Sequence, residues 1–271
     1  MLPPAMKTRG RSRIALNDKN CEPALAPPAV IPVLLLITPR RLYLPSGSAL
    51  PPPRVMITTV IFDLDGLLAD TEPLHCLAYQ DALQRCGAIL TPTEYADHWV
   101  RSGKGISEWL LSRGLELDPI QVRTHKAKRY LELLLASLRP MEGALQLLDE
   151  LYGKKKLALA SSSYRDAVEG VLGGLRITHY FDAIVTGLDV AQVKPSPDIF
   201  LAAARNIGAE PSECVVLEDA EKGVIAAHRA GMHCIAVPNE QTRLHDFSKA
   251  TRICSSLHEV TLELIDALAH G

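Results

Sequence analysis

The chain has 271 residues, of which 47% are hydrophobic and 22% charged, and its formal net charge is -2. This length is enough for about two domains and a sizeable buried core, which excludes a mini-protein held together by disulfides or a metal. The near balance of charge gives no reason to expect nucleic acid or a membrane surface as a partner.

The six cysteines are scattered along the chain, and none belongs to a Cys-x-x-Cys pair. This spacing is typical of neither a disulfide framework nor a zinc cluster. We therefore expect reduced, mostly buried thiols in a cytoplasmic protein. The six are Cys21, Cys76, Cys86, Cys214, Cys234 and Cys254.

Residues 1–55 differ in composition from the rest. Residues 1–54 hold 11 of the 19 prolines and eight Lys or Arg against two acidic residues, so their net charge is +6 and that of the remainder is -8. We do not expect this segment to pack as a regular domain. Its best apolar run, 29–37, is interrupted by Pro32 and is shorter than the ~20 residues of a transmembrane helix.

Two targeting interpretations of this tail are weighed against a simpler one. Residues 38–41 (TPRR) do not fit the end of a secretory signal peptide. The Arg-rich, acid-poor character fits an organellar transit peptide better, but the density of proline opposes an amphipathic helix. We favour a disordered tail, or translated upstream sequence with Met56 as the start, because Met56 directly precedes the first strand signal.

After residue 55, short apolar runs alternate with helical patterns. Five runs of four to seven residues predict buried strands: 56–62, 157–160, 181–186, 214–217 and 234–237. Helical patterns lie at 142–152, 165–172, 197–207, 221–230 and 259–268. Pro197 suits a first helical turn, and Gly208 and Gly231 suit helix C-caps. This alternation predicts an α/β fold with a Rossmann-like parallel sheet covered on both faces.

One stretch interrupts the alternation and divides the chain. From residue 74 to 138 there is no strand signal, but helical patterns occur at 74–86, 94–101, 108–113 and 120–138. We expect this stretch to be an inserted α-helical cap over the sheet edge. The predicted organisation is a core of residues 56–73 and 139–271 and a cap of residues 74–138.

The residues that end the predicted strands carry the chemistry. Because ligands of parallel sheets bind beyond the carboxyl ends of the strands, these side chains are expected to meet at one edge. They are Asp63 and Asp65 after the first strand, Ser161 after the second, Lys194 after the third, and Glu218 and Asp219 after the fourth. Four carboxylates at one edge of the sheet would repel each other, so we expect a cation among them. Ligand sets made only of oxygens favour Mg2+, and Lys194 would supply a fixed positive charge. Such a set is suited to binding a phosphoryl group.

Residues 60–66 (VIFDLDG) resemble the nucleophile motif of the haloacid dehalogenase superfamily. The other motifs follow in that family's order: 159–163 (LASSS), 193–200 (VKPSPDIF) and 215–220 (VVLEDA). A lone Asp-x-Asp-Gly is a weak signal, whereas four ordered motifs at strand ends are a strong one. The sequence looks most like the branch that contains β-phosphoglucomutase and small phosphosugar phosphatases, and the resemblance covers nearly all of residues 57–238.

The resemblance implies a role for each motif residue. Asp63 is the expected nucleophile that becomes an aspartyl phosphate, and Asp65 the acid for the leaving alkoxide and then the base for water. Ser161 and nearby backbone N–H groups would bind phosphoryl oxygens, and Lys194 would offset charge in the transition state. The resemblance also assigns Mg2+ to Asp63, the backbone carbonyl of Asp65, Asp219, and Glu218 directly or through water.

Other residues have weaker assignments. Glu218 could orient the metal ligands without binding the metal itself. His75 matches a histidine of the mutase branch but could equally be a hinge or helix-surface residue. Substrate-binding candidates are Ser161, Ser162, His75 and Lys104, and the cap adds Trp99, Ile106, Ser107 and Trp109 as candidates for specificity.

The resemblance leaves three functions open. Asp65 favours phosphate esters, because dehalogenases of the superfamily lack a carboxylate at that position. Residues 104–107 (KGIS) match a mutase cap loop, but Glu108 stands where that loop has an arginine for the substrate's second phosphate. A carboxylate repels a distal phosphate, although Arg101 or Lys104 could replace the clamp.

We therefore predict a Mg2+-dependent phosphatase of a small phosphorylated metabolite, with a phosphosugar mutase and a non-catalytic phosphate-binding protein as alternatives. We expect a monomer or weak dimer without a nucleic-acid or membrane partner. The sequence does not identify the natural substrate.

Overall fold

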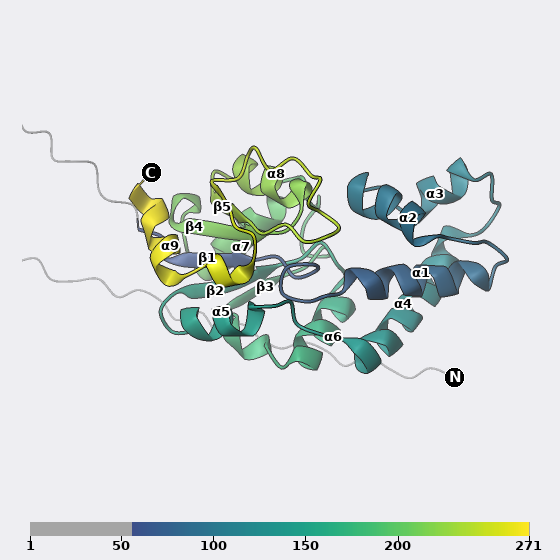
Figure 1. Cartoon of the computed structure of the whole chain (residues 1–271), viewed down its shortest axis with the longest axis horizontal. Coiled ribbons are helices and arrows are strands. Elements are labelled where there is room, and N and C mark those ends of the chain that lie inside the picture. The colour runs from purple at the N-terminus through teal and green to yellow at the C-terminus, as the bar shows by residue number, and fades with distance from the viewer. Residues whose placement is uncertain (1–55, 271) are drawn as a thin grey trace, which may run out of the picture. The chain divides into compact units, whose positions relative to one another are not determined.

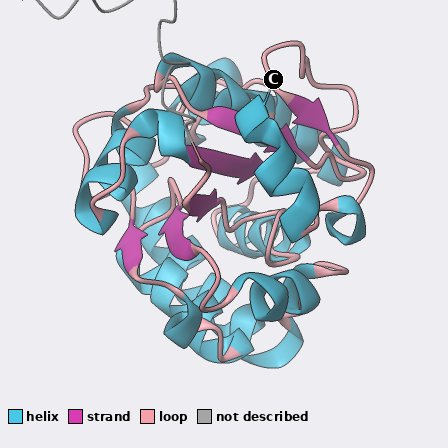
Figure 2. Cartoon of the chain, turned by 90° about the vertical axis from the view of Figure 1, so that its left-hand side faces the viewer, coloured by secondary structure: helices cyan, strands magenta, loops and turns pink. Residues whose placement is uncertain are grey.

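The computed structural model describes residues 56–270, so the predictions for residues 1–55 lie outside the described residues. Within the described part of the chain, six parallel strands form one sheet in the order β3-β2-β1-β4-β5-β6 (Figures 1 and 2). The strands are β1 (Thr59–Phe62), β2 (Lys156–Ala160), β3 (Ala183–Val185), β4 (Cys214–Glu218), β5 (His233–Ala236) and β6 (Arg252–Ile253). The predicted α/β fold with a parallel Rossmann-like sheet is confirmed.

Helices cover both faces of this sheet (Figure 1). On one face, Val60 and Phe62 of β1 pack with α5 (Ala144–Leu151), α6 (Arg165–Leu175) and α9 (Leu262–Ala267). On the other face, Ile61 packs with α7 (Asp198–Ile207) and α8 (Glu221–Arg229). Because successive strand side chains point to opposite faces, a strand buried on both sides is buried at every position, as β1 is.

The stretch without strand signals is helical. It contains α1 (Glu72–Gln84), α2 (Pro92–Tyr95), a π-helical turn (Ala96–Arg101), α3 (Ile106–Ser112) and α4 (Pro119–Ser137). We call residues 72–138 the helical insert. It has an apolar cluster of its own around Trp109, while Tyr130 and Leu134 of α4 pack into the core cluster.

The two segments that connect the insert to the sheet are hydrogen-bonded to each other. The Asp70 N–H donates to the Arg139 carbonyl at 3.0 Å, and the Met141 N–H donates to the Leu68 carbonyl at 2.9 Å. A bridge between Ala69 and Pro140 lies between these two bonds. The connectors therefore run side by side as they leave the sheet.

Several predicted boundaries differ from the structure. The first strand begins at Thr59 rather than Met56, and the helix predicted from residue 108 begins at Ile106. Pro197 precedes α7 instead of lying in its first turn, whereas Gly208 does cap that helix with φ 69°. Strand β6 was not predicted because it has only two residues, both exposed, and so shows no apolar run.

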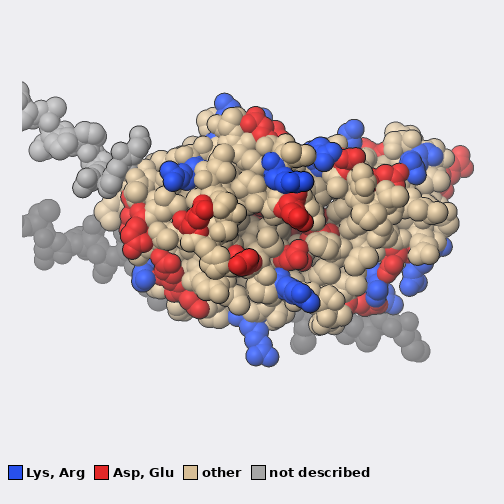
Figure 3. Space-filling view, viewed as in Figure 1, with Lys and Arg blue, Asp and Glu red and all other residues tan. Residues whose placement is uncertain are grey.

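No helix within residues 56–270 combines the length and apolar character needed to cross a membrane. On the face seen in Figure 3, the Lys and Arg side chains of the described residues are interspersed with Asp and Glu.

Candidate active site

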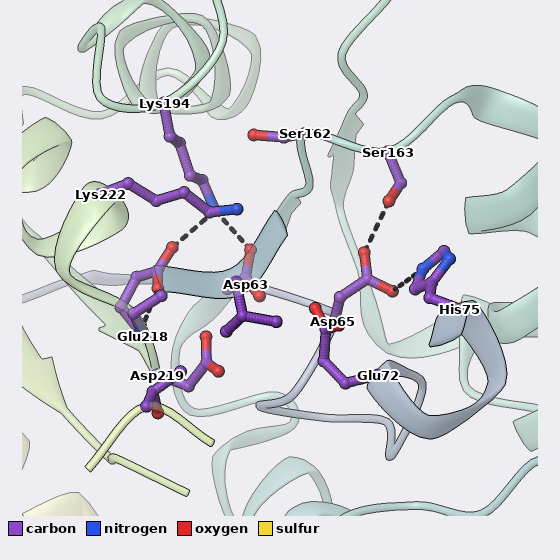
Figure 4. A pocket seen from close by; sticks show the side chains of 13 residues that line it. Asp63, Asp65, Glu72, His75, Ser162, Ser163, Lys194, Glu218, Asp219 and Lys222 are labelled. Carbon is purple, nitrogen blue, oxygen red and sulfur yellow. Dashed lines mark hydrogen bonds and ion pairs between the residues drawn. The ribbon is translucent and has the colours of Figure 1, made fainter. Parts of the chain in front are cut away.

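The register of the sheet brings the strand-end residues together. Phe62 pairs with Leu159 on β2 and with Leu217 on β4, so Asp63 follows at the level of Ala160 and Glu218. The carboxyl ends of these three neighbouring strands line a cavity of about 100 Å³. Its lining includes Asp63, Asp65, Glu72, His75, Ser162, Ser163, Lys194, Glu218, Asp219 and Lys222 (Figure 4).

Lys194 lies between two carboxylates at the base of the cavity. Its ammonium donates to Asp63 Oδ1, to Glu218 Oε1 at 2.8 Å and to the Ala160 carbonyl at 2.8 Å. Only 5% of Lys194 is exposed. Burial alone would lower its pKa, but the charges of Asp63 and Glu218 raise it above its usual value. Lys194 is therefore a permanently charged group.

Asp65 faces the opposite side of the cavity (Figure 4). Its carboxylate accepts hydrogen bonds from the hydroxyls of Thr71 at 2.7 Å, Ser163 at 2.7 Å and Ser161 at 3.2 Å. His75 Nε2 lies 3.5 Å from Asp65 Oδ1. Burial raises the pKa of Asp65, but His75 and the hydroxyl donors outweigh it and hold that pKa below its usual range.

The pKa values of the two aspartates of the first motif therefore shift in opposite directions. Burial raises the pKa of Asp63 to about 7, against the opposing charge of Lys194 and with help from Glu218 and Asp65. Burial likewise raises the pKa of Asp219, with Glu218 and Asp63 adding to the effect. Opposite pKa shifts in neighbouring carboxyls are typical of acid–base and nucleophile pairs.

Two glycines make room for these carboxylates. A Cβ at Gly66, where φ is +83°, would lie 2.5 Å from Asp219 Oδ2. A Cβ at Gly223 would lie 1.7 Å from Glu218 Oε1. Any side chain at either position would displace a carboxylate, so both glycines are part of the site.

The donor set fits a hard divalent cation. Asp63, Glu218 and Asp219 each offer a carboxylate oxygen, and these oxygens lie within 4.8 Å of one another. All three residues are buried, and all their ligand atoms are oxygens. Mg2+ prefers such ligands and would relieve the mutual repulsion that adds to the effect of burial on the pKa values of Asp63 and Asp219.

The structure places the remaining sequence candidates differently. Ser162 lines the cavity, and its hydroxyl is buried without a hydrogen-bond partner among residues 56–270. The Ser161 hydroxyl contacts Asp65 rather than open space. His75 lines the cavity, whereas Lys104 is exposed and does not.

The cap candidates do not gather at this cavity. Trp99 and Ile106 line a separate cavity of about 250 Å³ between the insert and the start of α6. Trp109 is buried in the apolar cluster of the insert, and Ser107 is exposed.

Sequence reasoning missed Lys126, which stands behind His75. Its ammonium lies 2.6 Å from His75 Nδ1 and 4.5 Å from the centre of the Tyr130 ring, on which His75 stacks. Where the Lys126 ammonium donates to Nδ1, the imidazole proton lies on Nε2, facing Asp65. Burial lowers the pKa of Lys126 to about 8. No sequence motif marks Lys126, because it joins His75 only when α1 packs on α4.

Replacing Lys126 with Met is expected to stabilise the protein while slowing it. Burial disfavours the ammonium in the folded state, so its cost is full below pH 8 and fades as the pH rises toward 10.5. The variant should have a higher Tm at pH 7, and this gain should shrink above pH 8. Turnover should fall by about 10- to 100-fold, because His75 is no longer held by Lys126 in the orientation that faces Asp65.

The check is a pair of Tm and rate measurements against pH, with Lys128→Met as control because Lys128 is exposed on the same helix. An unchanged rate with a lower Tm would mean that Lys126 only supports packing.

Comparisons with known proteins agree with this geometry. A family model described as haloacid dehalogenase-like hydrolase matches residues 60–237. The fructose-1-phosphate phosphatase YqaB of Escherichia coli is 32% identical over 184 residues, which are 66% of this chain and 95% of that protein.

Solved structures give the same result. CbbY from Rhodobacter sphaeroides, solved in complex with phosphate, has a TM-score of 0.70 and 30% identity and covers 78% of this chain and 100% of its own. β-Phosphoglucomutase from Clostridium difficile has a TM-score of 0.66 and 26% identity, covering 79% of this chain and 97% of its own.

Proposed function

Because the chain belongs to the haloacid dehalogenase-like hydrolases, we propose that it hydrolyses a small phosphate monoester, such as a sugar phosphate, with Mg2+ and through an aspartyl-phosphate intermediate. The enzyme class, a phosphoric monoester hydrolase of this family, is the part that its relatives establish. The observation that carries the finer proposal is the buried cluster of Asp63, Lys194, Glu218 and Asp219, with Asp65 held across the cavity from it.

In the first half-reaction, Asp63 attacks phosphorus through a carboxylate oxygen, and the bond between phosphorus and the leaving oxygen breaks. Asp65 gives a proton to the departing alkoxide, which leaves as an alcohol. Lys194 stays charged throughout and offsets negative charge on the phosphoryl oxygens. The Ser162 hydroxyl has no hydrogen-bond partner in the described part of the chain, which supports a role as a further donor to those oxygens.

In the second half-reaction, Asp65 removes a proton from a water molecule that attacks the aspartyl phosphate. The products are inorganic phosphate and free Asp63, and Asp65 has regained the proton that it gave. This cycle needs Asp65 to change protonation state within each turnover. Its low pKa without substrate keeps the carboxylate ionised and able to accept a proton, and a phosphate dianion bound nearby would raise that pKa for the acid role.

Asp63, Glu218 and Asp219 are the side chains that would hold Mg2+, with the Asp65 carbonyl as the further protein ligand expected for the family. A bound Mg2+ supplies a positive charge that favours ionised Asp63 and polarises the phosphoryl group.

Glu108 supports hydrolysis over mutase activity. Its carboxylate accepts a hydrogen bond from the Gly105 N–H at 3.2 Å and so caps the start of α3. The corresponding loop of the mutase carries an arginine at the position of Glu108. A negative charge there disfavours a substrate with a second phosphate.

The test is phosphate release from p-nitrophenyl phosphate and fructose 1-phosphate by the full chain. We expect turnover to depend on Mg2+ and to fall about 10³-fold in chelator, because a bound ion contributes several kcal/mol to stabilising the transition state. Turnover should recover when Mg2+ is added back. Equal rates with and without chelator would contradict the metal role. Isomerisation of a sugar phosphate primed by a sugar bisphosphate, without phosphate release, would favour the mutase.

A further inference from the structure

Asn239 connects two parts of the site that are distant in sequence. It lies in the loop after β5, and its side-chain Nδ2 donates to Asp219 Oδ2 at 2.8 Å and to the Gly66 carbonyl at 3.1 Å. Gly66 belongs to the loop that carries Asp63 and Asp65. One amide group thus holds an acidic residue at the end of β4 and the loop after β1 at fixed positions.

The orientation of this amide is set by its other end. Asn239 Oδ1 accepts the backbone N–H groups of Gln241 at 2.8 Å and Thr242 at 3.2 Å. The Asn239 N–H in turn donates to Thr242 Oγ1 at 3.0 Å. Because the oxygen faces two N–H donors, the NH2 group must face the two acceptors, Asp219 and Gly66. The loop therefore presents a donor to the site.

Asp219 depends on that donor. Only 4% of Asp219 is exposed, and within residues 56–270 Asn239 is the only hydrogen-bond donor to its carboxylate. Asp63 and Glu218 offer oxygens within 4.8 Å of it, and Lys194 contacts those two carboxylates but not Asp219. A buried carboxylate facing two others is repelled by them unless a donor holds it.

We propose that Asn239 is a positioning residue that holds the Asp219 carboxylate in the orientation that binds Mg2+. This inference rests on the metal site of the proposed function and adds to it a residue outside the four motifs. One oxygen of Asp219 is held by Asn239, which leaves the other for the ion. The link to Gly66 fixes the distance between Asp219 and the loop that carries Asp63. Both carboxylate ligands, Asp63 and Asp219, are therefore in place before Mg2+ binds.

The discriminating variant is Asn239→Ser, with Asn239→Ala beside it. A serine oxygen can still accept from the N–H groups two and three residues on, which preserves the turn, but its side chain is too short to reach Asp219. Gln241→Ala is the matched control, because this neighbouring side chain is exposed. Asp219→Asn is the reference for loss of a metal ligand.

Mg2+ binding to each full-length protein is measured by calorimetric titration and by the rise of Tm with Mg2+ concentration. We expect Mg2+ to bind about 10- to 100-fold more weakly to both Asn239 variants. The KM for p-nitrophenyl phosphate at saturating Mg2+ and the affinity of Gln241→Ala should stay at wild-type values.

The outcomes separate the two proposals. If Asp219→Asn weakens Mg2+ binding but Asn239→Ser binds as wild type does, the metal site stands and the role of Asn239 is overturned. That role is also overturned if the Asn239 variants lose Tm without Mg2+ but keep their Mg2+ affinity, because a purely structural residue behaves in this way. If Asp219→Asn binds Mg2+ as wild type does, the metal site itself is wrong and both proposals fall.

Discussion

Asp63→Asn is expected to reduce turnover of any phosphate monoester by ~10⁴-fold or more while the fold is retained. The amide keeps the size of the side chain and an oxygen that can accept from Lys194, but it is a poor nucleophile and forms no acyl phosphate. Phosphate release under saturating Mg2+ measures the loss. Rapid-quench labelling with a 32P-labelled ester should show an acid-stable phosphoenzyme in wild type and none in the variant.

The same substitution makes a prediction about stability. The pKa of Asp63 is raised from 3.8 to about 7, so its contribution to folding without Mg2+ is full below pH 4 and is lost as the pH rises through 7. Removing the titrating group should therefore flatten the fall in Tm between pH 4 and pH 7. Asp70→Asn is the control, because Asp70 is exposed a few residues along the chain. Retention of more than a hundredth of wild-type turnover would contradict the nucleophilic role.

Lys194→Met is expected to cost both stability and rate. The ammonium is the common partner of two buried carboxylates, and removing one member of a buried ion pair typically costs about 3–5 kcal/mol. The cost should grow with pH, because without Lys194 the carboxyls near it favour their protonated forms even more strongly. Chemical denaturation at pH 6 and pH 8 without Mg2+ measures it, and turnover should fall by about 10³-fold.

Mg2+ should restore part of the lost stability and little of the rate, since Lys194 and the ion neutralise overlapping charge but occupy different places. Arg165→Met is the matched control: its exposed ion pair with Asp189 should contribute at most about 1 kcal/mol. Equal loss of stability in both variants would mean that burial does not increase the contribution of the Lys194 ion pairs to the free energy of unfolding.

The strand-end residues were predictable because their position follows from topology alone. Apolar runs as short as 214–217 are readable, and parallel strands bring their carboxyl ends to one edge, so Asp63 and Glu218 meet whatever the details of packing. Ordered motifs then supplied their expected chemistry through the family resemblance. The same logic placed Lys194 near them, although it lies in a loop.

The residues that were missed depend on packing between helices and on loop geometry. Lys126 reaches His75 only because α1 lies along α4, and a lysine two residues from the exposed Lys128 on the same helix carries no sequence signal. Asn239 acts through a turn whose geometry a single sequence does not display. Lys104, in contrast, is exposed and does not line the cavity, so its substrate-binding role stays a prediction from the motif match alone.

The paired connectors limit how this protein can tolerate changes of length. The segments around residues 68–71 and 139–141 match each other residue for residue through main-chain bonds, and Thr71 in one of them also holds Asp65. An insertion or deletion in either segment would slip this pairing and withdraw the Thr71 hydroxyl from Asp65. Natural variation in chain length should therefore concentrate in the loops between the insert's helices and spare both connectors.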